Sequence, residues 1–457
     1  MASVSSGGIA TAAIRDLTKD SIAHHILTMA APAGVSMVAH IAYQLIDLYF
    51  VTRIGAAAAA GVNAAGNALL VITALAQVLI AGTLALVAQA VGRTDRVDAN
   101  LVFNQSMTLA VVCAIVTAAL LYAGVPTYMR QIAADAPTID AGIAFIIWVL
   151  PGYSLTLPMV VFSAALRGCG IVRPTMIIYV LTVVMNALLA PVLIAGWGTG
   201  IALGVRGAGF ATSISIAVCT VLLGAYFWRS QACMRMQPAL ATPRLRQWAR
   251  ILMIGLPAGG EFVLTLLYTA VVYYTIRDLG VSAQAGFSIG SRVLQAILLP
   301  GMAIAFAAGP VVGQNFAAGK WQRVRETFEK AALMATAIMV ATTLIVQSAP
   351  QALVAMFDAD PLTAEIAALF LQLMSWIFVA QGLIYICSTM FQGLGNTVPA
   401  LVSSAVRFMV FAGPAVWLSM RPTFHLETLW YLSMVSIVLQ AVVSLGLLRA
   451  EFRKLVP

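Results

Sequence analysis

The feature that most constrains this chain is a series of long apolar runs separated by short polar segments. At 1.5 Å per residue, each run can cross ~30 Å of hydrocarbon as a helix. Inside a bilayer the backbone polar groups must bond within the segment, which favours helices. We therefore predict an all-α integral membrane protein with twelve transmembrane helices, at about 23–51, 59–91, 100–124, 139–165, 174–196, 206–228, 247–276, 282–314, 322–348, 361–391, 397–420 and 425–449.

The composition excludes a soluble protein of this length. Hydrophobic residues make up 61% of the chain and charged residues only 9%, against roughly 25% charged in soluble domains. The net charge of +9 is not gathered in a basic patch interleaved with aromatics, so we expect no nucleic-acid partner. None of the five cysteines is in a CxxC pair and most lie in apolar stretches, so we expect small apolar side chains and no disulfide frame.

The loop charges predict the orientation. Loops on one side carry eighteen Lys and Arg residues, loops on the other carry five, and Arg292 and Arg407 fall inside spans. The basic side is normally cytoplasmic. We therefore expect a multi-pass protein of the cytoplasmic (inner) membrane with both termini in the cytoplasm. An even number of spans also places both termini on one side.

An internal repeat relates the two halves at a constant offset of 225 residues. It pairs Pro32 with Pro257 and Gln89 with Gln314, and other Gly, Tyr and Pro residues keep the same register. Six helices per half insert the same way up, so the halves should be two lobes related by a pseudo-twofold axis along the membrane normal. We place the lobes at 1–235 and 247–457, with a cytoplasmic linker at 236–246. Two such lobes predict a central cavity and a transporter that works by rocking.

Four ionisable residues lie well inside the predicted spans: Asp47, Glu261, Arg292 and Arg407. A charge at the bilayer centre costs at least ~3 kcal/mol on insertion scales, so each calls for a function or a partner. Asp47 shares one helical face with polar residues, namely Ser36, His40, Tyr43 and Gln44. This stripe is interpreted as a cation or substrate site, with a structural hydrogen-bond network as the alternative.

Glu261 shares its helical face with Thr265 and Tyr268. The repeat maps Tyr43 onto Tyr268, but the acids stand at different heights in the two halves. Glu261 is interpreted as a second functional acid, with a buried Glu–Arg pair as the alternative. Arg292 and Arg407 would pair with it or line the cavity. Pro32 and Pro257 lie in helix interiors and are expected to kink the two helices.

Several motifs that would indicate other functions are missing. The stretch GQNFAAGK, which ends at Lys320, has five residues between its glycines and Trp321 where a phosphate loop needs Ser or Thr. HExxH and clustered His and Cys are also absent from the sequence. We therefore expect no enzyme, no cofactor and no ATP drive within this chain.

The sequence resembles the multidrug and toxic compound extrusion (MATE) family over nearly its whole length. The resemblance rests on LIDLYFVTRIG, on AQAVG and VGQNFAAG, and on the turns LRGCGIVRP and FQGLGNTVP. It implies a twelve-helix antiporter in two lobes that exchanges Na⁺ or H⁺ for cationic amphipathic drugs and related toxins.

Carried over to this sequence, Asp47 matches the family's helix 1 coupling aspartate. Asn186 matches the helix 5 asparagine of the DinF-like branch. That branch has an aspartate four residues later, where this chain has Ala190. Thr212 resembles a helix 6 residue of the same site. A Na⁺ ion at Asp47 and Asn186 is one expectation. Glu261 resembles the NorM-like helix 7 glutamate, whereas the NorM-like helix 10 aspartate falls on Gln381. The branch, and the choice between Na⁺ and H⁺, stay open.

Two functions remain in competition at this point. The first is a monomeric, cation-coupled exporter of small organic compounds within the lipid bilayer. The second is a flippase for lipid-linked oligosaccharides from the wider superfamily, although such proteins usually have several cavity arginines and often extra helices. An integral-membrane enzyme or receptor is disfavoured because this chain has no catalytic constellation. A major-facilitator transporter is disfavoured because this chain lacks the charged loop that usually follows helix 2 in that class.

Overall fold

The computed structural model describes residues 15–457, except for 134, 231–233, 358–359, 423 and 456–457. Within this part of the chain all regular structure is helical, which confirms the all-α class. The α-helices are α1 Ile22–Thr52, α2 Ala56–Gly92, α3 Arg96–Ile132, α4 Ala136–Ser154, α5 Thr156–Gly168, α6 Arg173–Ala195, α7 Val205–Ser230, α8 Leu245–Ile276, α9 Val281–Ala317, α10 Trp321–Ser348, α11 Pro350–Ala355, α12 Pro361–Ser375, α13 Phe378–Leu394, α14 Val398–Ser419 and α15 Leu426–Leu455. Two 3₁₀ turns, η1 Pro238–Leu240 and η2 Arg277–Leu279, flank α8.

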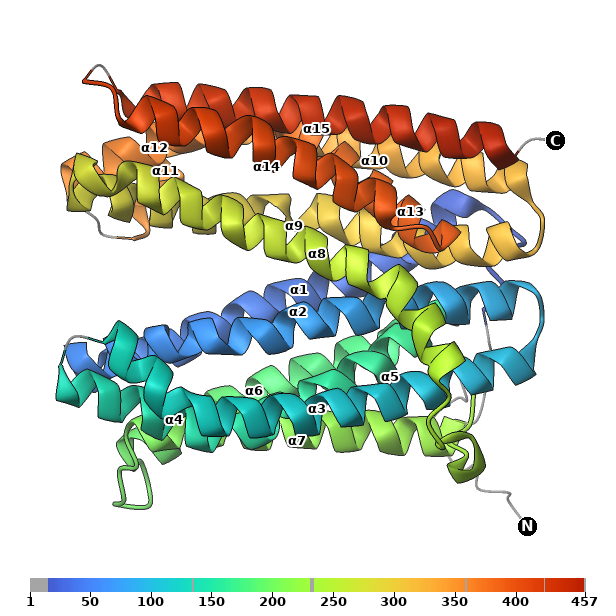
Figure 1. Cartoon of the computed structure of the whole chain (residues 1–457), viewed down its shortest axis with the longest axis horizontal. Helices are drawn as coiled ribbons and strands as arrows, with labels where there is room; N and C mark the ends of the chain where they lie inside the picture. Colours follow the sequence, from blue (N-terminus) through green and yellow to red (C-terminus); the bar gives the residue numbers. More distant parts are fainter. Residues whose placement is uncertain (1–14, 134, 231–233, 358–359, 423, 456–457) are drawn as a thin grey trace, which may run out of the picture.

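The helices form two lobes that run side by side along the long axis of the molecule. Figure 1 shows α1–α7 in one lobe and α8–α15 in the other. Among the described residues, eleven helical spans are long and apolar enough to cross a membrane, and the bent pair α12 and α13 makes a twelfth. The span count and the two-lobe arrangement therefore agree with the apolar runs.

Two predicted spans are broken in the structure. The run 361–391 is divided into α12 and α13, which meet at an angle of 62° around Trp376 and Ile377. No proline lies between residues 362 and 391, so the apolar pattern gave no sign of this bend. The run 139–165 is divided at Leu155 into α4 and α5. The short helix α11 lies outside every predicted run.

Small residues bring the lobes together at positions related by the repeat. A Cβ atom added to Gly34 of α1 would lie 3.6 Å from the Cβ of Ala303 in α9. A Cβ added to Gly259 of α8 would lie 2.5 Å from a methyl group of Val78 in α2. Each residue of the first pair is 225 positions from its mate in the second. The sequence repeat is therefore also a twofold of the lobe interface.

The contacts between lobes gather at one end of the molecule, which we call the closed end. It comprises 78–92 of α2, 250–259 of α8, 303–315 of α9 and the ends of α5 and α13 at Gly168 and Gly393. Here Gln89 Nε2 donates to the Gly393 carbonyl oxygen at 3.0 Å, and Gln314 Nε2 donates to the Gly168 carbonyl oxygen at 2.9 Å. Within the described residues, the hydrogen bonds between the lobes lie at this end. The lobes diverge toward the opposite end (Figure 1).

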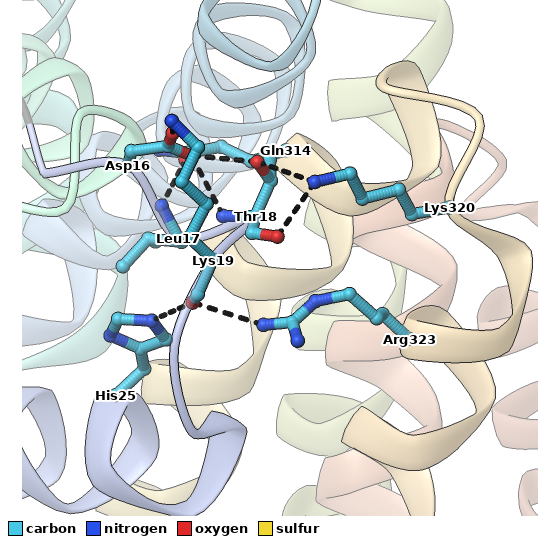
Figure 2. A network of polar contacts seen from close by, with 8 residues as sticks. All are labelled: Asp16, Leu17, Thr18, Lys19, His25, Gln314, Lys320 and Arg323. Atoms are coloured by element: carbon cyan, nitrogen blue, oxygen red, sulfur yellow. Dashed lines mark hydrogen bonds and ion pairs between the residues drawn. The ribbon is translucent and has the colours of Figure 1, made fainter.

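The segment before α1 adds a strap across the closed end. Figure 2 shows it against α9 and α10 of the other lobe. The Leu17 amide donates to Gln314 Oε1 at 2.9 Å, and Lys320 Nζ donates to the Thr18 carbonyl oxygen at 2.8 Å. Arg323 Nη2 donates to the Lys19 carbonyl oxygen at 3.1 Å. The strap therefore joins α1 to the second lobe through backbone groups.

Each lobe's apolar core includes residues from the other half of the sequence. Ile22 and Ile26 of α1 pack with Ala307 and Met390 of the second lobe. Ile251 of α8 packs with the core of the first lobe. The linker is held to α3, where Gln105 Nε2 donates to the carbonyl oxygens of residues 240 and 242. The predicted division at 236–246 stays a prediction, because the first turns of α1 and α8 serve both lobes.

The cysteines follow the sequence-based expectation only in part. Cys113, Cys219 and Cys387 are free thiols. Cys169 is disulfide-bonded, so the expectation of small apolar side chains without disulfides is wrong for this residue. Cys233 lies outside the described residues.

Candidate functional site

A polar cluster lies inside the first lobe, around Asp47 of α1. Thr212 Oγ1 of α7 donates a hydrogen bond of 3.3 Å to Asp47 Oδ2. The Tyr43 hydroxyl and the Asn186 side chain of α6 also neighbour this carboxyl group. Asn186 and Thr212 are buried. Three helices that are distant in sequence thus converge on one carboxylate, as the resemblance implied for these residues.

The cluster contains an unusual number of unpaired polar atoms. Asp47 Oδ1, the Tyr43 hydroxyl and both amide atoms of Asn186 are buried without a hydrogen-bond partner in the described part of the chain. A buried polar group without a partner costs ~1–3 kcal/mol, and more for a charged group. Atoms of this kind, gathered in one place, fit an ion, a proton or ordered water that completes their bonding.

A second polar network lies inside the other lobe, around Glu261 of α8. Ser388 Oγ of α13 donates to Glu261 Oε2 at 2.8 Å, and Ser404 Oγ of α14 donates to Glu261 Oε1 at 3.5 Å. Gln440 Nε2 of α15 in turn donates to Ser404 Oγ at 3.0 Å. Both carboxylate oxygens therefore accept from hydroxyl groups of neighbouring helices.

Arg407 of α14 completes this network from the side. Its Nη1 donates to Gln440 Oε1 at 3.4 Å, and its guanidinium carbon lies 4.3 Å from the ring centroid of Tyr268. The Tyr268 hydroxyl is hydrogen-bonded to Ser433. Within the described residues Arg407 reaches Glu261 through Gln440 and Ser404, so the simple Glu–Arg pair weighed above is replaced by a relay.

Of the remaining predicted site residues, some lie beside one of these two clusters and others are exposed. Gln381 is buried beside Tyr385, which itself lies near Glu261 and Arg407. His40 and Arg292 are exposed. The side chain of Gln44 lies outside the described residues. Asp47 and Glu261 are not brought together, because the partners of each belong to its own lobe.

The two helix-interior prolines lie in uninterrupted helices. Pro32 is inside α1 and Pro257 is inside α8. The Ser36 hydroxyl donates to the Pro32 carbonyl oxygen at 3.0 Å, whereas the helical bond that Pro32 cannot make is the one to the carbonyl of Thr28. The expected bending at these residues stays a prediction.

Sequence reasoning missed the residues that hold Glu261. In the sequence, Ser388, Ser404 and Gln440 stand only as polar residues within apolar spans. Polar residues inside apolar helices are the signal that could have found them, since bilayer helices place such groups toward protein. In the described part of the chain, no three His, Cys, Asp or Glu residues gather as a metal site would require.

The comparisons with known proteins agree with this architecture. The MatE family model matches residues 32–192 and 257–418, which are the two repeated halves. A relative named FAD transporter, from Shewanella oneidensis, is 23% identical over 85% of this chain and 86% of its own length. A relative named probable multidrug resistance protein NorM, from Thermotoga maritima, is 25% identical over 88% of this chain and 86% of its own length. Such names describe transporters and not enzymes.

Solved structures show the same fold. One, described as the outward-facing conformation of a multidrug resistance MATE family transporter, superposes with a TM-score of 0.89 at 22% identity, over 97% of this chain and 98% of that chain. Another, a superfamily transporter from Pyrococcus furiosus described as having a binding pocket of reverse polarity, has a TM-score of 0.88 at 22% identity, over 96% and 98%. Because the family model covers both six-helix halves, this chain is a multi-pass membrane protein that belongs to the MatE family, that of multidrug and toxic compound extrusion.

Proposed function

We propose that this protein is a secondary active antiporter that exports amphipathic organic compounds, including cationic drugs, in exchange for H⁺ or Na⁺. The observation that carries the proposal is the set of unpaired polar atoms around Asp47. A carboxylate, a hydroxyl and an amide beside one another can hold a cation by their oxygens. The same carboxylate can instead take a proton, because desolvation disfavours its charged form.

The lobe arrangement supports alternating access as the mechanism. The lobes meet through glycine contacts and two symmetric glutamine bonds at the closed end. A rocking motion would break these bonds and form new contacts at the other end. We place the closed end in the cytoplasm of an inner-membrane protein, with both termini there, because the basic loops lie at this end. A single chain supplies both lobes, so a monomer suffices.

Export would follow from competition between ion and substrate. An ion that binds at Asp47 in the outward-facing state must favour release of the drug, either directly or by bending α1 at Pro32. The relatives differ in their named substrates, which are FAD and multiple drugs. Family membership therefore supports transport of small organic molecules in general.

Dye transport by purified protein in liposomes tests this proposal. A Na⁺ gradient and a pH gradient are imposed separately, and release of a cationic dye is followed by fluorescence. We expect at least one gradient to drive transport and empty liposomes to show none. Absence of driven transport of any organic probe, together with translocation of a lipid-linked oligosaccharide, would instead establish the flippase.

A further inference from the structure

Arg292 of α9 is a charge within a membrane-spanning helix that neither of the two polar clusters uses. Its side chain is exposed, and no partner for it exists within the described residues. It is the twelfth residue of α9, about 17 Å from the start of the helix at 1.5 Å per residue. α9 has 37 residues and is about 55 Å long, so a ~30 Å hydrocarbon layer centred on it begins about 13 Å from its start. Arg292 lies inside this layer, where a charge facing lipid is costly. Arg292 therefore needs either water or a counter-charge.

The helix face that carries Arg292 is turned toward the other lobe. Arg292 precedes Ala303 by eleven residues, and α9 stays helical across Pro300 between them, so at about 100° per residue the two side chains lie on the same side of the helix. Ala303 is the residue that contacts Gly34 of the first lobe. Gly290, which packs on Phe370 inside its own lobe, lies on the opposite face. Arg292 thus continues the lobe interface toward the end where the lobes diverge.

The facing wall in the first lobe is uncharged at the equivalent position. The repeat maps Arg292 onto Asn67 of α2, and Asn67 is also exposed. Asn67 precedes Val78 by eleven residues, so it extends the Val78 contact face in the same way. Exposed apolar residues lie on the same helix faces: Val71 of α2 is 52% exposed and Leu45 of α1 is 50% exposed. We call these two faces of the first lobe, and the face of α9 that carries Arg292, the walls. The pseudo-twofold therefore sets an arginine across from an asparagine between apolar walls.

The carboxylates do not neutralise this arginine. Asp47 is bonded to Thr212 inside the first lobe, and Glu261 to Ser388 inside the second. Glu261 follows Gly259 by two residues, which turns it about 200° away from the interface. The charge that Arg292 gives this wall is therefore positive.

We propose that Arg292 binds an anionic group, a carboxylate or phosphate, of an amphipathic substrate that lies between the lobes. This inference rests on the export function proposed above and adds anionic and zwitterionic amphiphiles to its substrate class. A guanidinium group pairs with both anions in a bidentate manner. The apolar walls would hold the rest of the substrate, and Asn67 would add a neutral hydrogen-bonding group.

A matched pair of dyes tests the inference: a rhodamine with a free carboxyl group and its methyl ester, which share one ring system. Transport is measured in liposomes of phosphatidylcholine alone, so that no anionic lipid headgroup competes for Arg292. Each variant is compared with wild type for each dye, which cancels the difference in passive permeability. We expect Arg292→Gln to slow transport of the acid about tenfold and of the ester less than twofold, and Arg292→Lys to restore most of the acid rate.

Arg421→Gln is the matched control, because it removes one positive charge at an exposed residue beyond α14. It should change neither rate. An equal loss for both dyes in Arg292→Gln, or no loss for the acid, would overturn the inference, as would a wild type that moves only the ester. If adding phosphatidylglycerol abolished the preference for the acid in wild type, Arg292 would be a lipid-headgroup site and the inference would fail.

A wild type that moves neither dye would count against the export function, and binding would then decide the present inference separately. Fluorescence polarisation with the purified protein should show the acid dye binding about tenfold more tightly to wild type than to Arg292→Gln. Equal binding to the two proteins would overturn the role of Arg292. Variants that elute as a single species with wild-type thermal stability are folded and suitable for this comparison.

Discussion

Gln314 Nε2 donates a hydrogen bond of 2.9 Å to the carbonyl oxygen of Gly168, on the other lobe. Its repeat mate Gln89 makes the equivalent bond of 3.0 Å to Gly393. Donors and acceptors are both separated by 225 residues. The closed end is therefore held by a twofold pair of bonds that a rocking motion has to break, and the bonds should set how long the protein stays closed at that end.

Removing either glutamine should shift the conformational equilibrium. Gln89→Leu would leave a carbonyl unpaired, at a cost of about 1 kcal/mol, or roughly fivefold in population. Gln314→Leu would also leave the Leu17 amide without its acceptor and should have a larger effect. The reporter is Leu84→Cys in a background without reactive cysteines, because Leu84 is buried near Gly309 of the other lobe. Faster labelling of this cysteine is expected. Gln347→Leu, which breaks bonds within one lobe, is the control, and an equal increase there would contradict the assignment.

Asp47→Asn should abolish coupled efflux while expression stays near normal. The substitution keeps the shape of the side chain and removes the charge and the titratable proton. Thr212, Asn186 and Tyr43 would still surround it, so the lobe should fold. Efflux is measured at matched expression from pH 6 to 8, with and without Na⁺. Wild-type rates under all these conditions would remove Asp47 from the mechanism.

Glu261→Gln should impair efflux less than Asp47→Asn does. The amide oxygen of glutamine can still accept from Ser388, whereas the amide nitrogen offers Ser404 no acceptor and the charge opposite Arg407 is lost. We expect a reduction of several-fold, with a changed ratio between Na⁺-driven and pH-driven rates. Gln381→Asp, which restores an acid in the same lobe, should move that ratio again. If Glu261→Gln and Gln381→Asp both kept the wild-type efflux rate and the wild-type ratio of Na⁺-driven to pH-driven rates, the second lobe would have no part in coupling.

The orientation can be tested by labelling in intact cells. A cysteine near Pro243, in the segment between the lobes, should resist an impermeant thiol reagent, because we place it in the cytoplasm. A cysteine near His425, between α14 and α15, should react. Permeabilised cells, in which both positions should react, provide the control. The opposite pattern in intact cells would reverse the topology.

The sequence by itself determined the membrane class, the spans and the repeat. A long apolar run that crosses lipid can form its backbone hydrogen bonds within the segment only as a helix. The repeat is visible because paired residues such as Gln89 and Gln314 keep a constant spacing in the sequence. The face shared by Tyr43 and Asp47 also followed from helix geometry alone, since residues four apart lie one turn away from each other.

The tertiary structure decided which side chains meet across helices. Ser388, Ser404 and Gln440 join Glu261 because α13, α14 and α15 are rotated and set in depth by close packing, which no local pattern records. The bend between α12 and α13 arises within an apolar stretch that has no proline, so it too depends on packing. Arg292 and Arg407 looked equivalent in sequence. Only the packing of α9 left Arg292 exposed, while the position of α14 set Arg407 over Tyr268.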